Sequence, residues 1–326
     1  MAQAVSDRDV VAPPNWARQF EVEVTAPFRL DLTVWALRRR AHNAIDSWDG
    51  TSYRRTIVLG HRPVEMYVRQ VAAGHRPRLA VTLRGTGDAA GLSVAAVPAL
   101  IERTLGLGAD MTGFYSLAQK DSRLADLVSK FAGVRPPRFP SIFEALANAI
   151  ACQQLSLTVG IHLLNRLAAR FGPVVPGGAG VAGFPGPEAL AGTSPDELRT
   201  LGFSRAKAAT LTGLARLVAN GELDLDAVER LDDQAAVAAL VSLPGIGRWS
   251  AEYTLLRGLG RWQILPGDDV GARNNLRRRF GLVPDAGYDE VNRLSRSWWP
   301  YGGLVYFHLL LESLALAGVL TSPPPS

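Results

Sequence analysis

The chain changes character after its first third, from alternating segments to segments with helical periodicity. Residues 18–86 contain the alternating runs FEVEVTA and YRRTIVLG, followed by VEMYVRQVAAGHRPRLAVTLRG, in which AAGH has the composition of a hairpin connection. Between the first two runs, DLTVWALRRRAH has helical spacing, and a further helix is expected near residues 94–104. The pattern predicts a small sheet with a helix covering one face.

From about Gly113 onward, Ala and Leu recur with a period near 3.6, which predicts helices. Pro/Gly-rich loops are expected at 134–140 and 172–187. The fold class is therefore α+β: an N-terminal mixed antiparallel sheet domain (1–112) is followed by an all-α domain (113–326). The length of the chain, 326 residues, fits two domains. The predicted helices cover residues 122–132, 141–151, 156–171, 195–201, 205–219 and 233–242.

Targeting and cysteine signals are sparse. The N-terminal MAQAVSDRDVVAPPNWARQ is polar, and the apolar stretch at 302–320 contains His308 and Glu312, so we expect a buried terminal helix rather than a membrane span. The single cysteine, Cys152, excludes an intramolecular disulfide, a cysteine zinc site and a cysteine-ligated iron–sulfur cluster. We expect a cytoplasmic protein with no membrane partner.

The string LPGIG separates two helical segments. Pro244 cannot continue a helix, whereas Gly245 and Gly247 can adopt left-handed or open dihedral angles. The free backbone N–H groups at the start of the next helix would bind a phosphate by donating hydrogen bonds to it. The alternative is a plain turn with glycine caps. The proline before the turn, Arg248 after it and a net charge of +5 favour the phosphate.

LPGIGRWSAEY, followed by LPGDD, resembles the helix-hairpin-helix DNA glycosylase superfamily, and most closely the bacterial 3-methyladenine DNA glycosylase II family. That family follows its Pro-Gly-Ile-Gly-Arg-Trp hairpin, about twenty residues later, with an Asp-Asp pair whose second member is catalytic; here this residue is Asp269. FPSIFEALANAIACQQLSLTVG (139–160), SWWPYGGLVYFHLL (297–310) and the strand-rich start also resemble the family, so the resemblance extends from about Phe28 onward. It implies the same sheet domain and helical hairpin domain.

The resemblance implies that an ionised Asp269 stabilises the sugar cation left when the glycosidic bond breaks, and orients or deprotonates water. The alternative is that Asp268 or Asp269 only caps a helix; Asp268 could cap while Asp269 is catalytic. Bifunctional relatives place a nucleophilic lysine just after the hairpin, but Trp249 stands there. Because the three lysines (Lys120, Lys130 and Lys207) lie far away in sequence, we expect a monofunctional hydrolase without AP lyase activity.

Trp249 and Tyr253 share one helix face, which is typical of a core and equally of a pocket for a base. The resemblance assigns them to the pocket, where aromatic faces attract a cationic N-alkylated purine. Ala36 and Val270 stand where known members have aromatic residues, which leaves the substrate range open. The expected pocket residues are Trp249, Tyr253, Tyr301, Trp298 and Trp35.

The resemblance also implies the DNA contacts. Gln154, or the adjacent Leu155, would fill the gap left by the flipped base, unless both lie at a solvated helix start. The arginines after Asp269 would contact phosphates or form a solvated face: Arg273, Arg277, Arg278 and Arg279. The hairpin residues expected on the DNA backbone are Leu243, Pro244, Gly245, Ile246, Gly247 and Arg248. No cofactor or catalytic metal is implied, although a monovalent cation would fit on the backbone carbonyls of Val241, Leu243 and Ile246.

These features predict a monomeric, monofunctional DNA glycosylase that releases 3-methyladenine and 7-methylguanine type bases from double-stranded DNA. One alternative is a non-catalytic helix-hairpin-helix DNA-binding protein, although a carboxylate beside DNA would weaken its binding. The other alternative is a glycosylase for a neutral lesion such as hypoxanthine, ethenoadenine or uracil. Neutral bases leave poorly, so such a pocket would need a hydrogen-bond donor.

Overall fold

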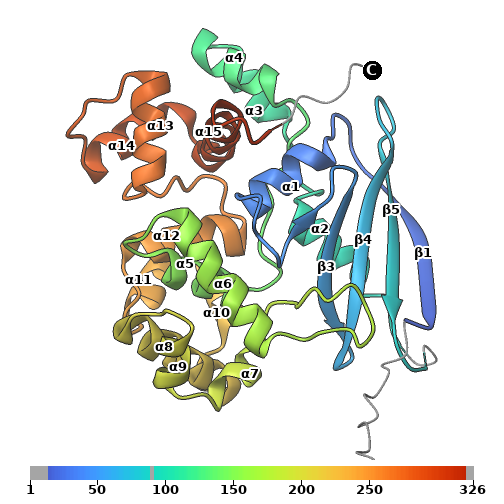
Figure 1. Ribbon diagram of the computed structural model, residues 1–326. Coiled ribbons are helices and arrows are strands. Elements are labelled where there is room, and N and C mark those ends of the chain that lie inside the picture. The colour runs from blue at the N-terminus through green and yellow to red at the C-terminus, as the bar shows by residue number, and fades with distance from the viewer. Residues whose placement is uncertain (1–13, 89–91, 321–326) are drawn as a thin grey trace, which may run out of the picture.

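The computed structural model describes residues 14–88 and 92–320, and its N-terminal part is a five-stranded antiparallel sheet in the order β1-β5-β4-β3-β2 (Figure 1). The predicted AAGH connection joins β4 to β5, and β1 pairs with the outer edge of β5. The sheet is antiparallel throughout, and together with the helices that follow it confirms the α+β class. The strands are β1 (Trp16–Glu23), β2 (Ser47–Trp48), β3 (Ser52–Leu59), β4 (Arg62–Ala72) and β5 (Arg78–Gly85).

Helices α1 (Leu30–Arg38) and α2 (Val97–Leu105) pack on the sheet with their buried apolar residues. Every second side chain of β4 and β5 packs against these helices, because successive side chains of a strand point to opposite faces of the sheet. Helix α1 ends earlier than its sequence pattern predicts, because Arg39 adopts a left-handed conformation with φ of +61°. The buried strand residues of this layer are Val64, Met66, Val68, Leu79, Val81 and Leu83.

All six predicted helices of the second part are present, and several begin at serine caps whose hydroxyl groups accept a backbone N–H. These helices are α4 (Ser122–Lys130), α5 (Ile142–Cys152), α6 (Leu157–Phe171), α8 (Pro195–Thr200), α9 (Arg205–Ala219) and α11 (Asp233–Val241). Shorter or later elements are α3 (Thr112–Ala118), α7 (Pro187–Ala191), α10 (Leu225–Glu229), α12 (Arg248–Thr254), η1 (Leu255–Leu259), α13 (Val270–Phe280), α14 (Tyr288–Ser295), η2 (Arg296–Trp298) and α15 (Gly302–Leu316).

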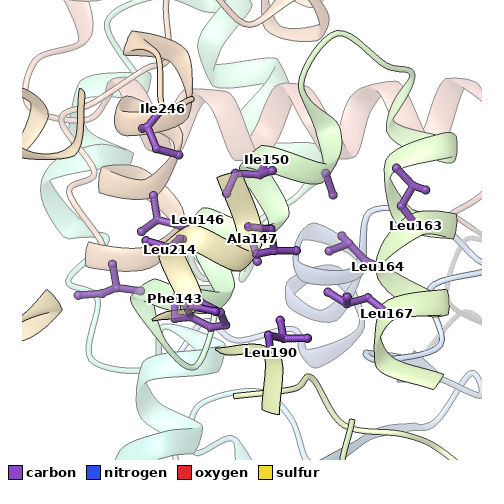
Figure 2. Packing of buried hydrophobic residues seen from close by; sticks show 14 of the residues in the cluster. Phe143, Leu146, Ala147, Ile150, Leu163, Leu164, Leu167, Leu190, Leu214 and Ile246 are labelled. Carbon is purple, nitrogen blue, oxygen red and sulfur yellow. The ribbon is translucent and has the colours of Figure 1, made fainter. Parts of the chain in front are cut away.

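Helix α5 is the centre of the helical core. Ten of its eleven residues are buried, and it packs against α6, α9 and α12. Figure 2 shows Phe143, Leu146 and Ile150 of this helix among leucines from neighbouring elements, with Ile246 of the turn after α11 pointing into the same cluster. The turn is therefore fixed to the core by Ile246, and the partly buried Leu243 packs against the same cluster.

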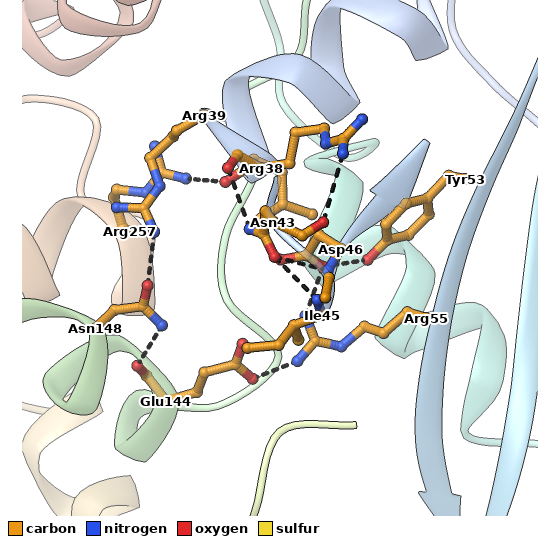
Figure 3. A network of polar contacts seen from close by, with 12 residues as sticks. Arg38, Arg39, Asn43, Ile45, Asp46, Tyr53, Arg55, Glu144, Asn148 and Arg257 are labelled. Carbon is orange, nitrogen blue, oxygen red and sulfur yellow. Dashed lines mark hydrogen bonds and ion pairs between the residues drawn. The ribbon is translucent and has the colours of Figure 1, made fainter. Parts of the chain in front are cut away.

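Buried contacts also cross residue 112, where the two predicted domains divide; that division itself stays a prediction. Phe139, Ala149 and Tyr253 belong to the same buried cluster as the sheet. An ion-pair cluster connects β3 to α5: Arg55 donates to Asp46 and to Glu144, each at 2.6 Å (Figure 3). The sheet and the helices therefore share both apolar and charged contacts.

The predicted terminal helix is α15, and His308 lies inside it with 1% of its surface exposed. Its Nδ1 faces the Leu304 carbonyl at 2.8 Å, and no partner for Nε2 is found among residues 14–88 and 92–320. Within those same ranges no helix is long and apolar enough to cross a membrane.

Burial lowers the pKa of His308 to about 4. In the unfolded chain a histidine pKa is about 6.5, so between pH 6.5 and 4 only the unfolded state binds this proton. Stability is therefore expected to fall as the pH drops through that window, by about 3 kcal/mol from this residue. Urea unfolding at pH 7.0, 5.5 and 4.5 should show a steeper loss for the wild type than for His308→Gln; parallel losses would contradict the assignment.

Candidate active site

The hairpin joins α11 to α12 and uses its two glycines differently. Gly245 has a φ of +79°, and a Cβ there would lie 2.1 Å from the Thr210 hydroxyl oxygen, so the fold itself requires glycine. Gly247 has an ordinary φ of −96°, and a Cβ there would meet nothing within 4 Å. Gly247 therefore leaves open space beside the start of α12.

No side chain caps α12, so its first amides keep their donors free, as at any uncapped helix start. Arg248 is exposed at this end, but its guanidinium forms an ion pair with Asp268 at 2.8 Å and lies 3.6 Å from the ring centroid of Tyr288. An arriving phosphate would thus meet backbone donors beside a partly neutralised arginine.

Asp269 lies next to this helix, with its two carboxylate oxygens in different surroundings. Oδ1 accepts the Ala272 amide at 2.7 Å, which makes Asp269 the N-cap of α13. Oδ2 accepts from Trp249 Nε1 at 3.2 Å and from the Tyr306 hydroxyl at 3.4 Å. The carboxylate is therefore oriented by the hairpin helix on one side and by α15 on the other.

Of the two candidate caps, Asp269 is confirmed as the N-cap, and the possibility that Asp268 caps the helix while Asp269 is catalytic is wrong about the cap. Asp269 has an extended backbone directly before the first helical residue, which brings its own Oδ1 to the amide. Asp268 instead accepts from Arg248 and Arg273, each at 2.8 Å in its ion pairs. Capping uses one oxygen of Asp269 and leaves the other facing the aromatic residues.

Glu252 supports the loop that carries Asp269, and the sequence reasoning missed it. Its carboxylate accepts the Gly267 amide at 3.2 Å and the Tyr288 hydroxyl, and burial raises its pKa. A single acid in the otherwise apolar helix face of WSAEYTLL was the available signal, because a buried carboxylate needs donors.

The expected aromatic residues are only partly brought together. Trp249 and Tyr253 lie 5.4 Å apart between ring centroids, and Tyr306, which was not predicted, donates to Asp269 as Trp249 does. A tyrosine inside an apolar helix needs a partner for its hydroxyl, and that signal was available in the sequence.

The other three expected pocket residues form no hydrogen bond with Asp269 in the described part of the chain. Trp298 is 3% exposed and packs 4.7 Å from Phe280 between ring centroids, and Tyr301 packs 5.9 Å from Phe114. Trp35 lies 4.8 Å from the guanidinium carbon of Arg38. Their part in a base pocket stays a prediction. Ala36 and Val270 stand where known family members have aromatic residues. Ala36 is buried, whereas Val270 is 69% exposed.

The loop between α5 and α6 is fastened to the hairpin. Gln153 donates to the Gly245 carbonyl and to the Ser250 hydroxyl, both at 2.9 Å. Gln154 follows with a φ of +52°, a costly conformation for a side chain of this kind, and both Gln154 and Leu155 are exposed. The two predicted wedge residues therefore lie at the tip of a loop held beside the hairpin.

Lys207 is far from the hairpin in sequence but close to this loop in space. Its Nζ donates to the carbonyls of Ala151 and Gln153 at 2.9 and 2.6 Å. Partial burial lowers the pKa of Lys207. The ammonium group thus provides hydrogen bonds to carbonyls at the carboxyl end of α5, next to the predicted wedge residues.

The predicted phosphate-contacting arginines are partly engaged within the protein. Arg273 pairs with Asp268, and Arg279 pairs with Glu312 and Asp126. The more exposed Arg277 and Arg278 donate to the Pro284 carbonyl and to Asn275 Oδ1. The contacts at Arg273 and Arg279 favour a structural role for those two.

The predicted cation site can be tested against the carbonyls themselves. The Leu243 carbonyl accepts the Ile246 amide at 3.1 Å, and in the described residues no donor reaches the carbonyl of Val241 or Ile246. Two of the three oxygens are therefore without a protein donor, and the cation site stays a prediction. The described residues contain no cluster of three His, Cys, Asp or Glu side chains that could hold a metal ion.

Comparisons with known proteins agree with this architecture. Residues 147–301 match the model of the HhH-GPD superfamily base excision DNA repair proteins, and residues 19–141 match the AlkA N-terminal domain. The chain is 30% identical to a DNA-3-methyladenine glycosylase of Bacillus subtilis over 61% of this chain, but it spans only 66% of that relative's length. It is 26% identical to DNA-3-methyladenine glycosylase 2 of Escherichia coli over 87% of this chain and 93% of the relative.

The fold is also that of a solved 3-methyladenine DNA-glycosylase from Archaeoglobus fulgidus. The two superpose with a TM-score of 0.76 at 26% identity, over 90% of this chain and 97% of the other. The sheet, the hairpin and the helix-capping Asp269 thus occur together in a chain whose two parts match two successive family models. The chain belongs to the HhH-GPD superfamily of base excision DNA repair proteins and, within it, to the DNA-3-methyladenine glycosylase II family.

Proposed function

We propose that this protein is a monofunctional DNA glycosylase of base excision repair that acts as a monomer on double-stranded DNA and releases alkylated purines of the 3-methyladenine and 7-methylguanine type. The observation that carries the proposal is the orientation of Asp269 by Trp249 of the hairpin helix and by Tyr306. These contacts join the hairpin helix to Asp269, which supports the proposal that the hairpin binds the DNA backbone while the carboxylate stabilises the sugar cation. The names of the relatives support the substrate class.

The chemistry follows from the charges in the site. A flipped N-alkylated purine carries a positive charge that aromatic faces such as those of Trp249 and Tyr253 attract. When its bond to C1′ breaks, the electron pair goes to the base, which leaves neutral, and the sugar becomes a cation. Asp269 stabilises that cation. Water then adds its hydroxyl to C1′, and its remaining proton passes to the carboxylate or to solvent.

Water is proposed as the nucleophile because no lysine amine is free at this position. Trp249 occupies the place after the hairpin, and Lys207 uses its N–H groups on two backbone carbonyls. A Schiff base requires an unprotonated amine at C1′. A monovalent cation on the carbonyls of Val241, Leu243 and Ile246 would add positive charge toward a phosphate.

The test is incubation of the purified protein with methylated DNA, followed by chromatography of the released bases. Free 3-methyladenine and 7-methylguanine are expected, with strands that break only after alkali and no covalent complex on borohydride treatment. Strand breaks without alkali, or a borohydride-trapped complex lost in Lys207→Met, would show a bifunctional enzyme. DNA binding without base release would favour the non-catalytic binder.

Gly247 offers a specific test of the hairpin. Gly247→Val places a side chain in space that is open in the free protein, so it should leave folding intact but keep a phosphate from the α12 amides. We expect roughly tenfold weaker binding to any DNA sequence, about the value of one charge-assisted hydrogen bond. Fluorescence anisotropy with two unrelated duplexes measures this. Gly192→Val is the matched control, since Gly192 also has open space but lies at the end of α7; equal affinity of the two variants would contradict the role.

A further inference from the structure

Helix α6 begins directly after the loop that carries the predicted wedge residues, and its exposed side is free of acids. Its fifteen residues, LTVGIHLLNRLAARF, include no aspartate or glutamate. Thr158, His162 and Arg166 follow one another at intervals of four, so they lie along one face of the helix, and all three are exposed. This face therefore continues from the wedge loop without a break in the chain.

The loop that follows α1 lies against the same face of α6 and adds a second arginine. Arg40 Nε donates to the Thr158 hydroxyl at 3.3 Å, and His42 Nε2 faces the Thr158 carbonyl at 3.3 Å. The His42 ring stacks on the His162 ring, with the centroids 4.1 Å apart and the planes at 15°. Four side chains thus form one surface, called the α6 patch below: Arg40, His42, His162 and Arg166.

The loop that supplies Arg40 and His42 is held in place by α6 itself. Asn165 of α6 accepts the Ala44 amide on its Oδ1 at 3.0 Å and donates from Nδ2 to the His42 carbonyl at 2.7 Å. Arg40 Nη1 donates to the Arg39 carbonyl at 2.9 Å. The α6 patch is therefore ordered before a ligand arrives, which lowers the entropic cost of binding one.

The two arginines of the α6 patch are not neutralised within the protein. Arg40 donates to a hydroxyl and a carbonyl oxygen, and Arg166 Nη1 donates to the Leu201 carbonyl at 2.9 Å. Neither arginine forms an ion pair in the described part of the chain, whereas Arg248 beside the hairpin is paired with Asp268. Unpaired guanidinium groups on an acid-free face favour a polyanionic partner.

The predicted wedge residues lie between the hairpin and the α6 patch. On one side of them, Gln153 donates to the Gly245 carbonyl of the hairpin, and on the other side Thr158 contacts Arg40 and His42. A side chain that fills the gap of a flipped base has one DNA strand on each side. A protein surface on either side of the wedge can therefore reach a separate strand.

We propose that the α6 patch binds phosphates of the strand opposite the flipped base, so that the N-terminal part of the chain takes part in DNA binding through Arg40 and His42. This inference rests on the proposed function, in which the hairpin binds the strand that carries the lesion. Guanidinium N–H groups match the geometry of phosphate oxygens, and an imidazole N–H can donate to them as well. The wedge would then enter a duplex that is held by both strands.

The experiment measures binding to a duplex that contains a tetrahydrofuran abasic-site analogue, by fluorescence anisotropy at several salt concentrations. Arg40→Gln/Arg166→Gln should bind roughly tenfold more weakly at about 0.1 M salt. Its plot of log K against log salt should be shallower by about 1 to 2, since each phosphate contact contributes about 0.9 to the slope. Arg40→Lys/Arg166→Lys, which keeps both charges, should recover most of the affinity and of the slope.

Uncharged methylphosphonate linkages identify the strand. Placed opposite the analogue in the complementary strand, they should weaken binding by the wild type but hardly change binding by the glutamine variant, because both changes remove the same contacts. Placed in the strand that carries the analogue, they should weaken both proteins to the same extent. A wild type that loses affinity only with the second duplex would overturn the inference, and this measurement decides should the glutamine variant fail to fold.

Arg76→Gln/Arg84→Gln is the matched control. These two exposed arginines lie in the β4–β5 connection and on β5, away from α6, and their loss changes the net charge equally (Figure 1). Binding should change by less than about twofold, because salt screens distant charges. A glutamine variant of the α6 patch that matches this control would overturn the inference. A wild type that binds the duplex but releases no base from methylated DNA would instead refute the glycosylase proposal.

Discussion

Asp269→Asn is expected to lower the rate of base release by about a thousandfold or more, while binding to an abasic-site analogue survives. A neutral amide cannot offset the positive charge that develops on the sugar. The side-chain oxygen of the substituted amide can still accept the Ala272 N–H, so the start of α13 should stay capped. Single-turnover base release and anisotropy on the analogue separate the two effects. Binding should be equal or tighter, since a negative charge beside DNA is removed.

Asp268→Asn is the control for this substitution. It removes the neighbouring negative charge and the ion pairs with Arg248 and Arg273, but not the contacts with Trp249 or Tyr306. We expect less than about a tenfold loss of rate, since ion pairs that are partly exposed to water contribute little. Substantial turnover by Asp269→Asn, or equal losses in the two variants, would contradict the assignment of Asp269.

The parts of the fold that could be predicted are those encoded locally. Ser141, Ser156 and Ser204 stand one residue before helices that the periodicity also predicts, and each caps its helix. The hairpin and Asp269 lie about twenty residues apart in the sequence. This spacing belongs to a known motif, so the sequence alone was enough to predict that they lie in one site. The short helices α7 and α10 have too few residues to show a period and were not predicted.

The contacts that complete the site could not be predicted, because they join distant residues. Tyr306 reaches Asp269 across 37 positions, and Arg39 reaches Tyr253 across 214. In the sequence, Arg39 is the middle residue of three consecutive arginines, a pattern typical of the basic, solvent-exposed end of a helix. The left-handed conformation that ends α1 turns it inward. Only the tertiary structure distinguishes a buried arginine from an exposed one.

The ion-pair cluster of Arg55 is the second place where a large effect is expected. Arg55, Asp46 and Glu144 are each less than 5% exposed, and the Tyr53 hydroxyl donates to Asp46 at 2.8 Å. Arg55→Met should lower the free energy of unfolding by about 3–5 kcal/mol at pH 7.5, because two buried carboxylates lose their cation. Urea unfolding measures the change. Arg69→Met, at an exposed position on the neighbouring strand β4, should cost less than about 0.5 kcal/mol.

The pH dependence distinguishes an electrostatic cause from a packing defect. Burial already raises the pKa of Glu144, and without Arg55 this carboxyl group should bind a proton still more tightly in the folded state than in the unfolded state. A folded-state pKa above the unfolded value contributes stability that is lost as the pH rises, so the deficit of Arg55→Met should shrink between pH 7.5 and 5. Adding Glu144→Gln should recover part of the loss at pH 7.5, since one buried charge is then removed. A deficit independent of pH and of Glu144 would mean that Arg55 joins the sheet to α5 by packing alone.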